Sequence, residues 1–93
     1  MPGETVMDLR MLTAGQIRAA RALLNLKQGD VAKGAGLSLT SYSYIESGRS
    51  DPRRSTLQAV QSWFEGQGVQ FISEGQLSPT GGPGVRLGPT GEG

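Results

Sequence analysis

The chain contains no cysteine and no histidine among its 93 residues. Without cysteine it forms no disulfide, and without either residue type it lacks the ligands from which the common zinc sites are built. A catalytic triad based on histidine is excluded as well. The acidic residues are scattered along the chain without a convincing pairing. We therefore expect no metal, no cofactor and no enzymatic activity.

Long hydrophobic runs are also missing. The longest apolar stretch falls far short of the roughly 20 residues that a membrane-spanning helix needs, and the N-terminus lacks the hydrophobic centre of a signal peptide. A length of 93 residues has room for one small domain with tails. We expect a cytoplasmic protein that does not bind membranes.

The net charge is only +1, which by itself is weak support for a nucleic-acid partner. Its distribution is more informative. Residues 12–72 carry seven lysines and arginines against four acidic residues, whereas the tails are slightly acidic. The excess positive charge therefore lies on the part of the chain that we expect to fold.

The chain does contain a helical pattern on both sides of Gly36. Apolar residues follow helical spacing before and after this glycine, at Val31, Ala32, Ala35, Leu37, Tyr42 and Ile45. Glycine accepts the positive φ that a sharp helix end requires. Ser38 is placed to cap a second helix, which we expect to stop at Gly48. Two helices joined by a glycine turn form a helix-turn-helix.

In these residues the chain resembles the phage lambda repressor-like (Cro/repressor, XRE-type) helix-turn-helix transcriptional regulators. The resemblance covers about Leu12 to Ile72 and rests on Gln28, Val31-Ala32, Gly36-Leu37-Ser38, and Tyr42 through Ile45-Glu46-x-Gly48. It implies an all-α bundle of four to five short helices with a small C-terminal β-strand pair. It also implies a sequence-specific regulator that binds double-stranded DNA, with the second helix of the motif in the major groove.

Capping boxes predict the helices on either side of the motif. One is Thr13-Ala-Gly-Gln16 and the other is Ser55-Thr-Leu-Gln58. Lys27 stands where a capping serine or threonine is expected, so the helix after it should fray at its start. Gly34 in that helix either costs about 1 kcal/mol relative to alanine or permits close packing of a neighbouring helix.

The predicted base-reading surface is the outer side of the helix that follows Ser38, and it consists of Leu39, Thr40, Ser43 and Tyr44. None of these is an arginine, glutamine or asparagine, the residues best suited to bidentate contacts with guanine or adenine. A helix of this composition also fits a protein-interaction module of the same fold, such as an antitoxin or anti-activator. Such a module would use Leu39, Tyr42 and Tyr44 as an apolar contact.

The predicted phosphate contacts lie around this helix, at Gln28, Ser38, Ser41, Arg49, Arg53 and Arg54. Arginine forks match phosphate oxygens, and the three arginines share one loop. For Gln28 the alternatives are support of the recognition helix or exposure to solvent. Arg18 and Arg21, one turn apart on the first helix, either contact phosphate or are solvated.

We divide the chain into four parts: a flexible arm (1–11), the helix-turn-helix domain (12–67), a strand pair (68–88) and a disordered tail (89–93). Alternation in Gly68–Ile72 and Val85–Leu87 predicts two short strands, which pair within the chain or between chains.

A single motif with three or four reading residues covers only a few base pairs. We therefore expect a homodimer that binds an inverted repeat. The predicted contact consists of Trp63, Phe64, Val69, Phe71, Val85 and Leu87, although Trp63 also suits packing against the core or tail. Removing residues 68–93 is then expected to leave the helices folded and to give a monomer.

Overall fold

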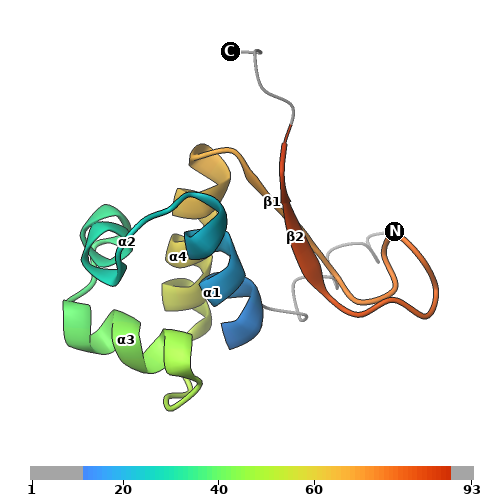
Figure 1. Cartoon of the computed structure of the whole chain (residues 1–93). Helices are drawn as coiled ribbons and strands as arrows, with labels where there is room; N and C mark the ends of the chain where they lie inside the picture. The colour runs from blue at the N-terminus through green and yellow to red at the C-terminus, as the bar shows by residue number, and fades with distance from the viewer. Residues whose placement is uncertain (1–11, 89–93) are drawn as a thin grey trace.

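A computed structural model describes residues 12–88, which fold into four helices followed by a strand pair (Figure 1). The elements are α1 (Ala14–Leu23), α2 (Gln28–Ala35), α3 (Leu39–Ser47), α4 (Arg54–Gly66), β1 (Val69–Ile72) and β2 (Gly84–Leu87). The predicted helical bundle with a small C-terminal strand pair is confirmed. The predicted arm (1–11) and tail (89–93) lie outside the described residues.

The first helix begins at the predicted capping box. The Thr13 hydroxyl accepts a hydrogen bond from the Gln16 N–H (3.0 Å), and Gln16 Oε1 accepts one from the Thr13 N–H (3.0 Å). Two of the amides that a helix start leaves unpaired are thereby satisfied.

The turn between α2 and α3 follows the prediction closely. Gly36 and Gly48 both adopt φ +77°, and the Ser38 hydroxyl accepts from the Ser41 N–H at 3.1 Å. The weak start expected at Lys27 is offset by Asp30, whose Oδ2 accepts the Lys27 N–H at 2.9 Å. The helix-turn-helix therefore has defined ends at both of its helices.

The second predicted capping box is wrong. Helix α4 begins at Arg54, with Arg53 in extended conformation (φ −65°, ψ 154°) as the cap residue and no side-chain hydrogen bond at the cap. Ser55 therefore lies inside the first turn. Pro52 and Arg53 still belong to the loop, and Arg53 rather than Ser55 takes the extended conformation of a cap residue, so the helix starts before Ser55.

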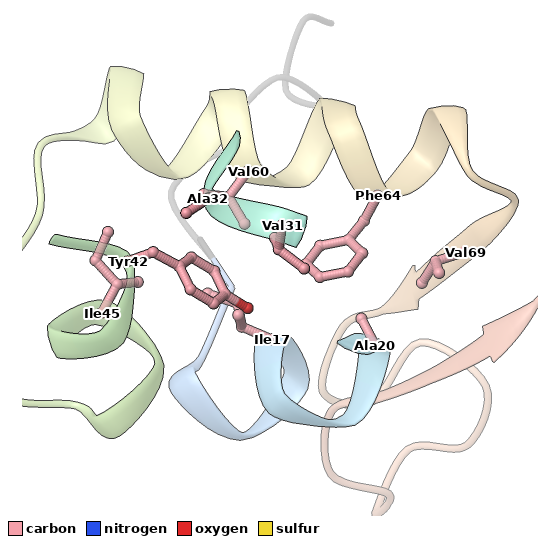
Figure 2. Packing of buried hydrophobic residues seen from close by; sticks show 9 residues of the cluster. All are labelled: Ile17, Ala20, Val31, Ala32, Tyr42, Ile45, Val60, Phe64 and Val69. Carbon is pink, nitrogen blue, oxygen red and sulfur yellow. The ribbon is translucent and has the colours of Figure 1, made fainter. Parts of the chain in front are cut away.

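The core collects side chains from all four helices and from β1 (Figure 2). The buried apolar residues are Ile17, Ala20, Val31, Ala32, Tyr42, Ile45, Val60, Phe64 and Val69. This arrangement makes α2 and α3 one side of a small bundle, and in Figure 1 the strand pair lies on the other side of α1.

The strand pair is antiparallel within one chain, with Val69 opposite Leu87 and Phe71 opposite Val85. Phe71 meets Phe64 edge to face, with 6.1 Å between ring centroids. Phe64 and Val69 are 0% and 2% exposed, so both pack this chain's own core and neither is available as a dimer surface. The predicted boundary after residue 67 therefore does not separate two independent cores.

Gly34 lies directly beneath the indole of Trp63, so a Cβ at this position would overlap the ring. Close packing of α2 on α4 thus explains this glycine. We expect Gly34→Ala to destabilise the fold by roughly 1 to 3 kcal/mol, because overpacking outweighs the helix propensity gained. Unfolding in urea, followed by the fluorescence of the single tryptophan Trp63, measures this change in the free energy of unfolding.

Gly29 supplies the matched control, because it lies in the same helix and a Cβ there would meet nothing within 4 Å. Gly29→Ala is expected to stabilise the fold by up to about 1 kcal/mol through helix propensity alone. If both alanines shift the unfolding midpoint in the same direction, the contact between Gly34 and Trp63 is not the cause.

Within residues 12–88, no helix combines the length and the apolar character that crossing a membrane requires.

Candidate nucleic-acid interface

The outer face of α3 presents most of the predicted reading residues to solvent. Leu39 and Tyr44 are 54% and 48% exposed, and Thr40 is exposed as well, whereas Ser43 is half-buried. Exposed apolar side chains of this size on a short helix are suited to contact with another molecule. The face is therefore free to enter a groove, with Ser43 at its margin.

The inner face of α3 is held by a network centred on Glu46, which is 2% exposed. Arg21 of α1 forms a bidentate ion pair with it, through Nε to Oε1 (2.8 Å) and Nη2 to Oε2 (2.6 Å). Gln28 of α2 donates to Oε2 at 3.2 Å, and Arg18 donates to the backbone oxygen of Glu46 at 2.7 Å. One residue thus fixes α3 against both α1 and α2.

These contacts set the charge state of the carboxyl. Burial pushes the pKa of Glu46 upward, but the hydrogen bonds from Arg21 and Gln28 and the positive charge of Arg21 outweigh it, so the pKa lies below its usual value. The same pairing raises the pKa of Arg21. Both side chains are therefore ionised at neutral pH. Each charge compensates the other, which a buried carboxylate needs in order to remain charged.

Tyr42 lies one turn before Glu46 and its side chain is fully buried. Burial raises the pKa of its phenol. Its hydroxyl has no hydrogen-bond partner among the residues that the structure describes. Tyr42 therefore acts as a core residue, as its helical spacing predicted, and it is not available as the apolar contact that a protein-interaction module would use.

The residues predicted to contact phosphate divide into two groups. Arg49, Arg53 and Arg54 are exposed, and the last two flank the start of α4, where no acidic residue stands in the first turn. The N-terminus of a helix is the positive end of its dipole, and here two arginine side chains add to that positive charge. An anion such as a phosphate placed there is therefore stabilised by the dipole and by the arginines together.

In the second group, two side chains already have partners within the chain. Gln28 is half-buried and supports α3 through Glu46, which was one of its predicted alternatives. Ser38 uses its oxygen to cap α3, while Ser41 is exposed. Phosphate contact by any of the three stays a prediction. Arg21 is engaged by the Glu46 carboxylate, whereas Arg18 is exposed and donates one hydrogen bond to the Glu46 backbone oxygen. Phosphate contact by Arg18 stays a prediction.

Two functional positions escaped the sequence interpretation. Glu46 was seen only as part of a family pattern, although an acid four residues after the inward-facing Tyr42 must itself point inward and needs a cationic partner. Gln16 was assigned only to its cap, whereas its Nε2 also donates to Ile72 O (3.0 Å) and Gly84 O (3.0 Å). No local signal marks that second contact.

Two further features bear on partners. A groove of about 500 Å³ runs along β1 and is lined by Glu65, Val69, Gln70, Phe71, Ile72, Gln76, Leu77 and Arg86. Leu77, one of these lining residues, is 64% exposed, and Leu87 in β2 is 47% exposed. Across residues 12–88, no group of three or more acidic side chains is arranged to hold a metal ion.

A comparison with protein-family models matches residues 17–62 to a helix-turn-helix family. The match begins in α1, ends in α4 and contains α2 and α3 whole, so this segment is a helix-turn-helix by sequence as well as by geometry. Residues 17–62 thus form a helix-turn-helix domain of the lambda repressor-like, XRE-type regulators, a family of DNA-binding proteins. A search of curated proteins found no match.

Proposed function

We propose that this protein is a sequence-specific transcriptional regulator that binds an inverted-repeat operator as a dimer, in the cytoplasm and without enzymatic activity. The observation that carries the proposal is the exposed outer face of α3, held from behind by the ion pair between Arg21 and Glu46. A helix fixed in this way presents Leu39 and Tyr44 at a constant angle. Leu39 packs on a thymine methyl, while the hydroxyls of Thr40 and Tyr44 bond base edges.

Selection of bound DNA from a random library tests this proposal. The wild-type protein should enrich one inverted motif, and Thr40→Ala should relax discrimination at particular base pairs by roughly 1 to 3 kcal/mol while leaving stability nearly unchanged. Ser62→Ala, which removes an exposed hydroxyl from α4 and leaves the outer face of α3 intact, is the control. Enrichment of no motif by the folded wild-type protein would refute sequence-specific binding.

The arginines at the start of α4 are assigned to phosphate. We expect Arg53→Ala and Arg54→Ala each to weaken binding to all DNA sequences alike and to reduce the salt slope of log K by about one. Binding constants measured between low and moderate salt give this slope. A changed base preference with an unchanged slope would instead assign these side chains to base reading.

A second function is supported by the chemistry of the α3 surface, where two large exposed side chains, Leu39 and Tyr44, occur without any arginine, lysine, glutamine or asparagine in the helix. An antitoxin or anti-activator of the same fold would bury them against a protein partner. In that case Leu39→Ala leaves DNA retention unchanged, and the wild-type protein shows no salt-dependent retention on DNA.

The dimer contact is assigned to the strand pair. The groove along β1 and the exposed Leu77 and Leu87 form its apolar part, with Phe71 and Val85 half-buried in the same strand pair. Trp63, also predicted for this contact, packs instead on Gly34 of α2. Glu65 and Arg86 both line the groove, so a two-fold contact can pair the glutamate of each chain with the arginine of the other.

We expect Leu87→Glu to convert the dimer to a monomer with little change in the stability of each chain, because this side chain is about half exposed within the chain. Sedimentation equilibrium measures the change. A wild-type chain that stays monomeric at high concentration and also on its operator would rule the dimer out.

A further inference from the structure

Gln16 joins the strand pair to the helical bundle. Its side chain is 7% exposed, and its Nε2 donates to Ile72 O and Gly84 O, each at 3.0 Å. These two residues face each other across the sheet. Gln16 Oε1 meanwhile accepts the Thr13 N–H at 3.0 Å. One amide therefore uses both of its donor hydrogens on the strands and its acceptor on the helix cap.

These bonds differ in kind from the other contacts of the strand pair. Among the described residues, no other side-chain hydrogen bond connects a strand to a helix. The remaining contact is apolar, through Val69 and through Phe71 against Phe64. Apolar burial is non-directional, whereas two hydrogen bonds from one planar amide restrict both distance and angle.

The same helix also holds the reading helix. Arg18 and Arg21 of α1 bind Glu46 of α3, and Gln16 lies one turn earlier on α1. Side-chain hydrogen bonds therefore connect the strand pair to α3 through α1. Because Arg18 and Arg21 bind α1 to α3, a change in the angle of the strand pair on α1 also changes its angle to α3.

We propose that Gln16 is a positioning residue: it fixes the direction of the strand pair on the bundle and thereby the half-site spacing that the dimer accepts. The second part rests on the proposed dimeric DNA binding. One base pair of spacing changes the separation of two half-sites by about 3.4 Å and their rotation by about 34°. A dimer discriminates between such spacings only when the reading helix α3 of each chain is held at a fixed angle to the dimer contact on the strand pair.

Gln16→Glu separates the two roles of this side chain, which are capping the start of α1 and positioning the strand pair. A glutamate at the third helical residue completes a capping box as well as glutamine does. It has no N–H to donate, however, and it would place a carboxylate against two carbonyl oxygens. Gln16→Glu therefore keeps the start of α1 and removes both bonds to the strands. Thr13→Ala is the matched control, since it removes the cap hydroxyl and keeps the two bonds.

The first test measures, without DNA, how the strand pair is oriented relative to α3. Because the chain has no cysteine, Ser47→Cys in α3 and Arg86→Cys in β2 can carry spin labels, diluted with unlabelled protein so that only distances within one chain are read. We expect a narrow distance distribution for the parent and for Thr13→Ala, and one about twofold wider or shifted for Gln16→Glu. Gln16→Met, which removes the donors without adding charge, is measured in parallel in case the carboxylate prevents folding.

A parent distribution that is already wide would overturn the proposal, as would folded Gln16 variants that keep the parent distribution. An equal broadening in Thr13→Ala would also overturn it, since general loosening of α1 would then be the cause.

The second test measures spacing on DNA, using a library of inverted half-sites separated by spacers of different length. The parent and Thr13→Ala should prefer one spacer over those one base pair longer or shorter by roughly tenfold, and Gln16→Glu should lose this preference while selecting the same half-site. An unchanged spacer preference in a folded Gln16 variant would overturn the role in spacing. If the parent selects no DNA, the proposed function fails, and the label distances still decide whether Gln16 fixes the strand pair.

Discussion

Replacing Glu46 by glutamine is expected to lower the free energy of unfolding by about 3 kcal/mol, the lower end of the range for breaking a buried ion pair. The lower end applies because the Arg21 side chain is 27% exposed and regains some hydration, whereas Glu46 is almost fully buried. The substituted amide also turns an N–H toward the guanidinium in place of an acceptor. Chemical denaturation of both proteins at neutral pH measures the difference.

The same variant should change the dependence of stability on pH. The folded-state pKa of Glu46 is depressed, so its contribution is fully present above the unfolded-state pKa of about 4.3. The contribution is lost as pH falls from there through the folded-state pKa. The wild-type protein should therefore lose more stability than Glu46→Gln on acidification, and the two curves should converge at low pH.

Two further variants test whether the loss of the ion pair with Arg21 causes the lower stability of Glu46→Gln. Glu74→Gln changes an exposed glutamate between β1 and β2 that does not line the groove, so it should alter stability by less than about 0.5 kcal/mol. Adding Arg21→Met to Glu46→Gln should recover part of the loss, because an apolar pair leaves no charge buried without a partner. Additive losses in this cycle would show that the two side chains are not coupled.

Ending the chain after Gln67 is expected to abolish cooperative unfolding of the helices. The sequence led to a different expectation, that the helices stay folded without residues 68–93 while operator affinity falls and the protein becomes a monomer. The truncation removes Val69 from the core and Phe71 from the face of Phe64, and it leaves the donors of Gln16 without their carbonyl partners. Together these losses amount to several kcal/mol, comparable with the whole stability of a small domain. Thermal unfolding followed by circular dichroism tests it.

Single substitutions separate burial from dimerisation in this experiment. Val69→Ala should cost about 2 kcal/mol, since two buried methyl-sized groups are lost, while Leu87→Ala on the opposite strand should cost far less. A truncated chain that melts as cooperatively as the full-length protein would restore the boundary after residue 67.

Structural features that depend only on residues three or four positions apart, such as helix caps and turns, were predictable from the sequence. The cap at Thr13, the hinge at Gly36 and the cap at Ser38 depend on local dihedral angles and on amides one turn away, and all three are present as expected. The cap assigned to Ser55 failed because two local signals compete there. The extended loop ends at Arg53 and the helix begins at Arg54, so Ser55 already lies in the first turn and cannot cap it.

Features that join distant residues were not predictable in this way. Glu46 meets Arg21 across 25 residues and Gln16 meets Gly84 across 68, and no periodicity within one helix encodes such pairs. The assignment of Phe64 and Val69 to a dimer contact, although Phe64 was also expected on the inward stripe of its helix, was wrong for a related reason. Their spacing shows that they are apolar and inward-facing, but whether they pack the chain's own core or a partner depends on where the strands lie.

The restraint on α3 comes almost entirely from one side of the helix. Tyr42, Ile45 and Glu46 bind it to the bundle, while the side chains of Leu39, Thr40 and Tyr44 take part in no hydrogen bond that stabilises the described fold. Exchanging these outward side chains therefore leaves folding nearly untouched. With the reading role proposed above for these three side chains, duplicated copies of this chain could change their target by a few substitutions that each leave the fold intact, and a new specificity could be designed at the same positions.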